Sequence, residues 1–150
     1  MKAVIQRVRE AEVKVDGQSI GSIGKGYLIL VGFCNGDDEQ IIEKMIGKIL
    51  NLRIFEDEAG KMNLNIRDVG GEILSVSQFT LYADCRKGNR PGFTDAARAE
   101  DASRMYDRFN QLLSEQIHVE TGKFQADMKV SLINDGPVTI ILDSNEIVRK

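Results

Sequence analysis

Three side chains that can form hydrogen bonds, Ser77, Gln78 and Thr80, lie beside an otherwise aliphatic segment. Residues 73–76 just before them have the composition of a buried strand. If the strand continued, Gln78 and Thr80 would share one face, and Ser77 and Phe79 the other. A polar group buried without a partner costs roughly 1 to 3 kcal/mol. These side chains therefore either bond to backbone at a strand end or serve a site, and composition alone does not decide between the two.

A loop with several basic residues follows this segment. Arg86, Lys87 and Arg90 lie within residues 84–92, together with two glycines. The net charge of −3 does not favour nucleic-acid binding by the molecule as a whole. A local basic cluster can hold phosphate, but a solvated loop is the more common meaning of such a run, and the sequence alone favours that meaning.

The residue types that most often act in catalysis or bind metals are scarce. The chain has one histidine, His118, and two isolated cysteines, Cys34 and Cys85. No spacing among them suits zinc, so we expect no metal site and no cofactor. A serine or cysteine triad would need His118 as its base. Because no serine or cysteine motif lies near His118, we expect a surface or strand-end histidine.

The stretch from Asn134 to Thr139 reads Asn-Asp-Gly-Pro-Val-Thr. Asp-Gly between two strands is a strong β-hairpin signal, and a simple turn is the plainest interpretation. Pro137 complicates it, because proline has no N–H to donate where the returning strand would begin. X–Pro bonds are cis in only about 5 to 6% of cases in folded proteins. The residues alone therefore do not decide the isomer of the Gly136–Pro137 bond.

The elements that must position these residues follow one another irregularly along the chain. Apolar periodicity predicts two amphipathic helices, the first capped by Asp37 or Asp38, among several strands. The predicted strands are 3–8, 11–15, 27–33, 53–55, 73–76, 128–133 and 138–142, and the predicted helices are 38–51 and 97–116. This order favours an α+β fold, with a mixed, barrel-like β-sheet core and two main helices, over repeated βαβ units.

Length and composition predict one globular domain, residues 1–150. The chain is 42% hydrophobic and 29% charged, which is typical of soluble proteins. No apolar run approaches the roughly 18 residues of a membrane span. The first residues also lack the long apolar centre of a signal peptide. We therefore expect a cytoplasmic protein without a membrane partner.

Two motifs in order, Ser77-Gln78-Phe79-Thr80 and Asn134-Asp135-Gly136-Pro137-Val138-Thr139, resemble the paired signature of the D-aminoacyl-tRNA deacylases, formerly called D-tyrosyl-tRNA deacylases. Either motif alone is weak, but the two together are specific. The resemblance extends along nearly the whole chain, through residues 5–8, 53–55, 60–63 and 122–128. Gln125 departs from the pattern, since members of the family carry a small residue there.

The resemblance implies an enzyme that hydrolyses the ester between a D-amino acid and the 3′-terminal ribose of tRNA, as chiral proofreading in translation. It implies a homodimer with aminoacyl-tRNA as its partner. In this family Gly136-Pro137 would be cis, with both carbonyls pointing into the active site of the partner subunit. Such a backbone filter excludes a side chain on the L face and lets glycine pass, so mischarged glycyl-tRNA would also be cleaved.

The same resemblance assigns roles to individual residues. Gln78, Phe79 and Thr80 would be catalytic, while Arg86, Lys87 and Arg90 would bind tRNA. The substrate-binding residues would be Ser77, Phe124, Met128, Gly136, Pro137 and Arg7, with Arg7 holding the turn. Water could be positioned by the 2′-hydroxyl of tRNA, with backbone N–H groups near Phe79 and Thr80 stabilising the oxyanion. Alternatively Thr80 is the nucleophile, although no base to activate it is visible.

Two other classes of protein remain compatible with the residues themselves. A tRNA-binding module without catalysis would share the basic loop but would have no reason to keep Gly136-Pro137 facing Thr80. A hydrolase of free D-amino acid esters or peptides would act without tRNA.

Overall fold

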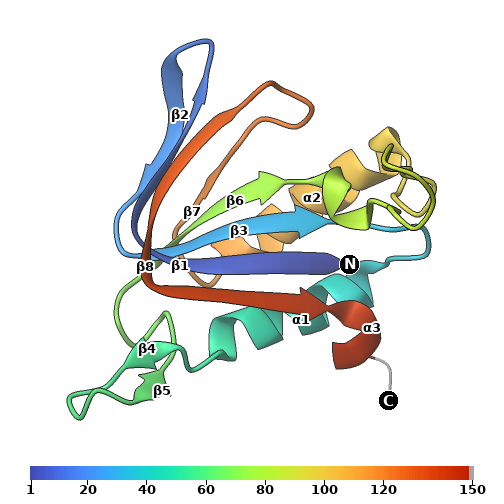
Figure 1. The fold of residues 1–150 in the computed structure, drawn as a ribbon. Helices are drawn as coiled ribbons and strands as arrows, with labels where there is room; N and C mark the ends of the chain where they lie inside the picture. The colour runs from blue at the N-terminus through green and yellow to red at the C-terminus, as the bar shows by residue number, and fades with distance from the viewer. Residues whose placement is uncertain (149–150) are drawn as a thin grey trace.

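The computed structural model describes residues 1–148 as a mixed β-sheet with two long helices packed on one face (Figure 1). Strand β1 is central: residues 2–8 pair with β3, residues 11–15 pair with β2, and β8 runs antiparallel along both halves. Strands β3, β6 and β7 are mutually parallel. Because the two halves of β1 have different neighbours, the sheet curls and becomes nearly barrel-like. The strands are β1 Lys2–Val15, β2 Gln18–Ile23, β3 Gly26–Gly32, β6 Glu72–Ser77, β7 Val119–Thr121 and β8 Lys129–Asp143.

Both predicted helices are confirmed. Helix α1 is Glu39–Asn51, and the Oδ1 atom of Asp38 accepts a hydrogen bond from the amide of Ile41 at 2.9 Å, as expected of an N-cap. Helix α2 is Ala99–Ser114. Two short helices add to them, η1 Phe79–Tyr82 and α3 Ser144–Ile147. No helix in residues 1–148 is both long and apolar enough to cross a membrane.

A small hairpin precedes β6 in the chain. Its strands are β4 Phe55–Glu56 and β5 Met62–Leu64, which pair antiparallel. The hairpin lies at the end of the molecule where β8 bends sharply (Figure 1).

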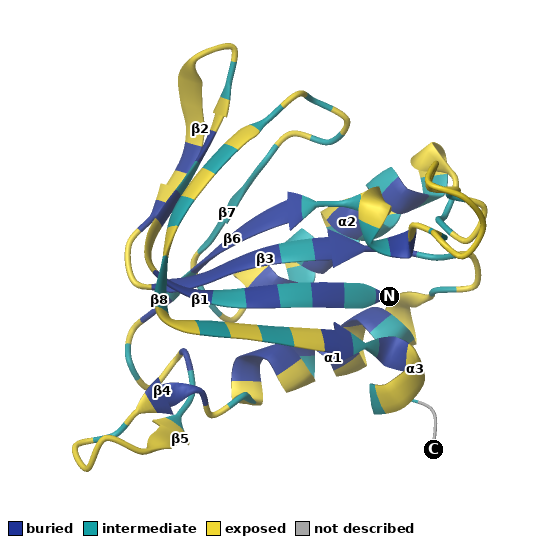
Figure 2. Cartoon of the chain, viewed as in Figure 1, coloured by how far each residue is buried: buried dark blue, intermediate teal, exposed yellow. Residues whose placement is uncertain are grey.

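The alternation of side chains along the strands divides the core into two clusters. One face of the sheet packs against α1 and α2, with Ile5, Tyr27 and Ile29 fully buried beneath the helices. Residues pointing the other way, among them Val8, Leu28 and Leu74, pack inside the curl of the sheet against β8. Figure 2 shows the consequence: β3 and β6 are buried almost throughout, while β8 alternates between half-buried and exposed residues.

The predicted hairpin between 128–133 and 138–142 is wrong. Strand β8 is continuous, and both of its halves pair with β1 in the same direction. Asn134 lies opposite Val8 and Thr139 opposite Gln6, so residues 135–138 form a bulge that faces Arg7 alone. The side chain of Asn134 closes this bulge, accepting from the amide of Val138 at 2.8 Å and donating to Thr139 Oγ1 at 3.1 Å. We call residues 135–138 the β8 corner.

Two glycines give a paired test of the fold. Gly26 lies opposite Glu72 where β3 meets β6, and a Cβ there would be 1.8 Å from the Glu72 carbonyl oxygen. We expect Gly26→Ala to lower the free energy of unfolding by at least about 3 kcal/mol, because a clash with backbone has no rotamer that relieves it. A Cβ at Gly47 on α1 meets no atom within 4 Å, so Gly47→Ala should raise stability by about 0.5 to 1 kcal/mol. Urea denaturation measures both, and a Gly26→Ala protein as stable as wild type would contradict the β3–β6 register.

Candidate functional site

A pocket opens where β6 ends and α2 begins. Its volume is about 610 Å³. Five of the residues proposed from sequence lie in its wall, namely Ser77, Gln78, Phe79, Phe124 and Met128. They come from two segments about fifty positions apart, the end of β6 and the link between β7 and β8, so the fold brings these predicted residues together.

The alternation of side chains between two strand faces, expected from the sequence for residues 77–80, is not found in the structure. Strand β6 stops at Ser77, and the chain then turns into η1, so Gln78 and Thr80 do not share a strand face. The amide of Gln78 donates to the Val31 carbonyl at 2.8 Å, which fixes the turn against β3. The Gln78 side-chain amide donates to the hydroxyl of Thr80, which is exposed.

The first turn of η1 leaves backbone donors unused. Neither the N–H of Phe79 nor that of Thr80 donates to another atom of the described residues, whereas the amides of Leu81 and Ala83 bond back to Gln78 and Thr80. This is the expected state of the first amides of a helix. Two adjacent donors are therefore available beside the pocket.

Three aromatic rings, those of Phe79, Phe93 and Phe124, line the pocket. Phe79 is 53% exposed and packs edge-to-face on Phe93, with ring centroids 4.9 Å apart. On the other side, Phe124 lies 6.3 Å from the ring of Tyr106. Phe93 and the start of α2 were not predicted to belong to the site, and their local sequence carries no signal for it. Flat apolar walls with a few polar groups suit an aromatic or acyl ligand.

A buried hydroxyl joins the elements that carry the pocket wall. Tyr106 Oη donates to the Ser75 carbonyl at 2.6 Å, and the amide of Gly122 donates to the same oxygen at 3.0 Å. Burial raises the pKa of the Tyr106 phenol, so it remains a neutral donor. These bonds join α2, β6 and the segment that carries Phe124 and Met128.

Gln125, the residue that departs from the family pattern, adopts a left-handed backbone conformation with φ 62°. The amide of Ala126 donates to the Lys123 carbonyl at 3.1 Å, so Gln125 occupies the third position of a tight turn. That position favours glycine or asparagine, which explains why a small residue suits it. Gln125 nevertheless lines the pocket.

The β8 corner lies away from this pocket. Gly136 and Pro137 are both exposed, and the bond between them is cis. The corner faces Arg7, Arg7 pairs with Tyr27, and Tyr27 pairs with Ile73 at the start of β6, whereas the pocket wall on β6 begins at Val76. The two are therefore separated by about 10 Å along the strands and about 14 Å across three strand spacings. Within one chain, the structure does not bring the corner to Thr80.

Arg7 contacts the corner directly. Its Nε atom donates to the Asp135 carbonyl at 2.9 Å, and its Nη1 atom donates to the Ile54 carbonyl at 2.7 Å. The side chain is buried, with Arg7 only 7% exposed. A Cβ placed on Gly136 would lie 3.0 Å from Arg7 Nη2, so the corner has no room for a larger residue.

The basic residues of the 84–92 loop are all exposed and lie outside the pocket wall. Arg86 is paired with Asp84 at 2.9 Å, and this contact lowers the pKa of Asp84 to about 2. Lys87 and Arg90 form no ion pair within residues 1–148. Two of the three cations are thus free to meet a phosphate without breaking an existing contact.

His118 is a surface histidine, as the sequence predicted. Its Nε2 atom lies 2.7 Å from the carboxylate of Glu120, and its carbonyl accepts from the amide of Ile73, at the end of β6 opposite the pocket. It cannot serve as a base for Ser77 or Thr80.

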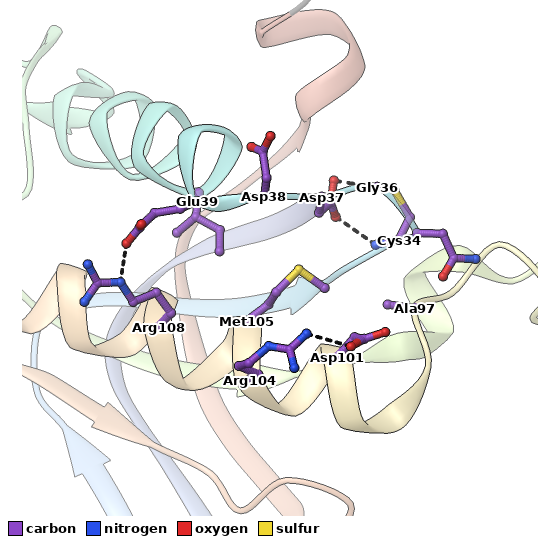
Figure 3. Close-up of a pocket in the computed structure, with 12 residues that line it drawn as sticks. Cys34, Gly36, Asp37, Asp38, Glu39, Ala97, Asp101, Arg104, Met105 and Arg108 are labelled. Atoms are coloured by element: carbon purple, nitrogen blue, oxygen red, sulfur yellow. Dashed lines mark hydrogen bonds and ion pairs between the residues drawn. The ribbon is translucent and has the colours of Figure 1, made fainter.

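A second crevice, about 520 Å³, lies between the start of α1 and α2 (Figure 3). Figure 3 shows two ion pairs in its wall: Arg104 pairs with Asp101, and Arg108 pairs with Glu39. None of the residues proposed for the site lies in its wall. Since both arginines in its wall are already paired with carboxylates and none of the proposed site residues lies there, the pocket at the end of β6 is the better candidate site.

Comparison with known proteins gives a consistent family. Residues 4–143 match the family described as D-Tyr-tRNA(Tyr) deacylase. The D-aminoacyl-tRNA deacylase of Kosmotoga olearia is 58% identical over 146 residues, covering 97% of this chain and 99% of that protein. That of Lactobacillus acidophilus is 58% identical over 144 residues, covering 95% and 99%.

Two solved structures share the fold. One, named c-Myc DNA Unwinding Element Binding Protein, matches with a TM-score of 0.91 and 46% identity over 95% of this chain and 98% of that one. The other, a probable eukaryotic D-amino acid tRNA deacylase, matches with a TM-score of 0.81 over 94% and 97%. At 16% identity, this second likeness concerns the fold alone.

Proposed function

The chain belongs to the D-aminoacyl-tRNA deacylase family, and from this membership we propose how its residues cleave the ester between a D-amino acid and tRNA. It is a D-aminoacyl-tRNA deacylase, a hydrolase that releases free D-amino acid and tRNA. The observation that carries this conclusion is the 58% identity over almost the full length of both chains. Since aminoacyl-tRNA is the substrate of translation, we place the enzyme in the cytoplasm.

Water attacks the ester carbonyl in the proposed mechanism. The acyl–oxygen bond breaks, one proton of the water passes to the 3′-oxygen of tRNA and the other is released to solvent, and the amino acid leaves as its carboxylate. The neighbouring 2′-hydroxyl of the ribose positions the water, because it lies beside the carbonyl in every aminoacyl-tRNA. No protein nucleophile is then required.

The protein stabilises the developing oxyanion with backbone. The unused N–H groups of Phe79 and Thr80 support this role, since Phe79 lines the pocket and Thr80 is the next residue in the chain, although Thr80 itself lies outside the pocket wall. One such donor is worth about 100- to 1000-fold in rate. The Gln78 side chain, bonded to the Thr80 hydroxyl, holds the first turn of η1 in place. Ser77, Phe124 and Met128 line the pocket that receives the substrate.

Stereochemical selection comes from the β8 corner of a second subunit. The corner is exposed and lies too far from the pocket of its own chain to act there, which supports an arrangement in trans. In that arrangement the Gly136 and Pro137 carbonyls occupy the space that the side chain of an L-amino acid would need. A D-substrate fits, and so does glycine, so mischarged glycyl-tRNA is a further substrate.

The homodimer has support from the surface of β8. Ile141 is 71% exposed and Ile133 is 49% exposed, both on the strand that carries the corner. The two side chains lie on either side of the corner, opposite Glu10 and Val4 of β1, and burying both against a second subunit would remove their apolar surface from water. A two-fold dimer buries the same patch on both subunits and delivers each corner to the other pocket. Sedimentation analysis of the purified chain tests this directly: a monomer at micromolar concentration would exclude it.

The loop with Arg86, Lys87 and Arg90 binds the tRNA backbone in this proposal. It follows η1 directly, and its cations point to solvent near the pocket. Phosphate contacts make binding weaken with salt. Replacing all three by alanine should therefore flatten the salt dependence of tRNA affinity, and an unchanged slope would leave these charges as solvated surface.

One assay tests the activity against the two other classes of protein. The enzyme is incubated separately with D-tyrosyl-tRNA, L-tyrosyl-tRNA and D-tyrosine methyl ester, and release of tyrosine is followed. We expect appreciable turnover of D-tyrosyl-tRNA only, because the tRNA supplies both binding energy and the 2′-hydroxyl. Binding of tRNA without hydrolysis would indicate a non-catalytic module, and turnover of the methyl ester would indicate a general D-ester hydrolase.

Removing the Thr80 hydroxyl distinguishes the two mechanisms. Thr80→Ala keeps the backbone N–H that contacts the oxyanion, so single-turnover deacylation of D-tyrosyl-tRNA should stay within about tenfold of wild type, the scale of one neutral hydrogen bond. Rapid-quench measurement of the chemical step gives this rate. A fall to the uncatalysed rate would favour a covalent Thr80 intermediate instead.

Adding bulk at the corner tests the filter. In Gly136→Ala the new Cβ would lie 2.8 Å from Val138 Cγ2 and 3.0 Å from Arg7 Nη2, at φ 137°, so the corner must move. We expect hydrolysis of L-tyrosyl-tRNA to rise at least about tenfold relative to D-tyrosyl-tRNA, the equivalent of losing one steric contact. The ratio of the two kcat/KM values reports this. Unchanged selectivity would reject a filter made of these residues.

A further inference from the structure

Arg7 is a buried cation without an acidic partner. It is only 7% exposed, and within residues 1–148 no carboxylate forms an ion pair with it. A buried charge normally needs a counter-charge or several hydrogen bonds. The hydrogen bonds that Arg7 makes are to two backbone carbonyls, those of Asp135 and Ile54. Something else in its surroundings must favour the guanidinium.

The two carbonyls belong to segments far apart in the sequence. Asp135 starts the β8 corner, and Ile54 lies just before the β4–β5 hairpin. The guanidinium therefore joins the corner to the hairpin, and the position of each segment limits the position of the other.

The ring of Phe55 supplies the missing contact. The Cζ atom of Arg7 lies 5.9 Å from the centroid of this ring, a cation–π distance. The ring of Tyr27 also stacks on Phe55, with the ring centroids 5.5 Å apart and the planes inclined by 26°. Phe55 is itself only 4% exposed, so its contact with the cation is screened little by water. A second cation, Lys25, lies 5.7 Å from the same ring but is exposed.

The hairpin is rigidly closed next to Phe55. Arg53 donates to the carbonyl of Asn63 at 3.1 Å and to its side-chain oxygen at 2.6 Å. The Asn63 amide in turn donates to Asp57 at 2.8 Å. Asp57 also accepts from the amides of Ala59 and Lys61. These bonds fix the strand that holds the Ile54 carbonyl and the Phe55 ring at defined places.

We propose that Phe55 is a positioning residue for stereochemical selection: its ring and the adjoining Ile54 carbonyl orient Arg7, and Arg7 orients the β8 corner. The inference rests on the proposed function of that corner as the filter. It adds a part of the molecule, the β4–β5 hairpin, that no motif connected with the site. Phe55 touches no substrate and acts only through Arg7.

The test changes the ring electronics while keeping its shape. Phe55 is replaced in the full-length protein by 4-fluoro-, 3,5-difluoro- and 3,4,5-trifluorophenylalanine, which withdraw electron density from the ring face in steps. We expect the ratio of L- to D-tyrosyl-tRNA kcat/KM to rise with each fluorine, reaching on the order of tenfold, the scale of a desolvated cation–π contact. The thermal midpoint should fall by no more than the few degrees that the weakened cation–π contact itself accounts for, since the packing is retained. A ratio that stays constant across the series would overturn the proposal.

Two controls separate positioning from general destabilisation. The same fluorinated series at Phe109, which is fully buried in the same core on α2 and faces no cation within residues 1–148, should leave the ratio unchanged. Lys25→Ala removes the exposed cation from the Phe55 ring and should also leave it unchanged. An equal rise in the ratio for the Phe109 series would overturn the proposal, because any loosened core would then relax selection.

A parallel variant distinguishes failure of this inference from failure of the proposed filter. Arg7→Lys cannot donate to both carbonyls in the same fork and should raise the L/D ratio. If Arg7→Lys relaxes stereochemical selection and the Phe55 series does not, Phe55 is excluded as a positioning residue. The proposal that the β8 corner is the stereochemical filter then stands. If neither changes the ratio, the link from Arg7 to the corner fails, and the proposal on Phe55 fails with it.

Discussion

The pairing of β1 with β8 is the constraint on which the rest of the molecule depends. Both halves of β8 follow β1 in one direction, so the extra residues between Asn134 and Thr139 have no partner strand and must bulge outward. The same pairing leaves Arg7 facing the bulge, where its guanidinium can reach the Asp135 carbonyl. If either half were unpaired, the segment would be an ordinary mobile loop. The double pairing makes it a fixed projection.

Local sequence signals were sufficient for elements that depend only on residues close together in the chain. Helix α1 follows from its apolar period and its Asp38 cap, both of which lie within the helix or next to it. The β8 corner could not be found in the same way, because a hairpin and a corner share the same turn residues. What distinguishes them is the partner strand, and β1 lies some 130 positions earlier in the sequence. Turn residues indicate that the chain bends at this point, but they do not indicate which strand the flanking segments pair with.

For the candidate site, too, the sequence identified the residue types but not their arrangement in space. Ser77, Gln78 and Phe79 were identified by their polar and motif character, and they do line the pocket. Their arrangement was not predictable, since the turn into η1 depends on a hydrogen bond from Gln78 to Val31 on another strand. Phe93 was missed because it enters the wall through contact with Phe79, and a single phenylalanine in a polar loop has no distinctive pattern. The backbone N–H groups of the proposed chemistry were expected near Phe79 and Thr80 from the family resemblance alone, because residue types do not show which backbone groups remain unbonded.

The separation of corner and pocket has a consequence for mixed populations of chains. In the proposed assembly, each catalytic centre takes its pocket from one gene product and its filter from another. A substitution in the corner would then impair the site of an unaltered neighbour, while leaving the pocket of its own chain intact. In a mixed dimer of one altered and one unaltered chain, a corner defect would therefore appear at the pocket of the unaltered chain, whereas a pocket defect would appear at the pocket of the chain that bears it.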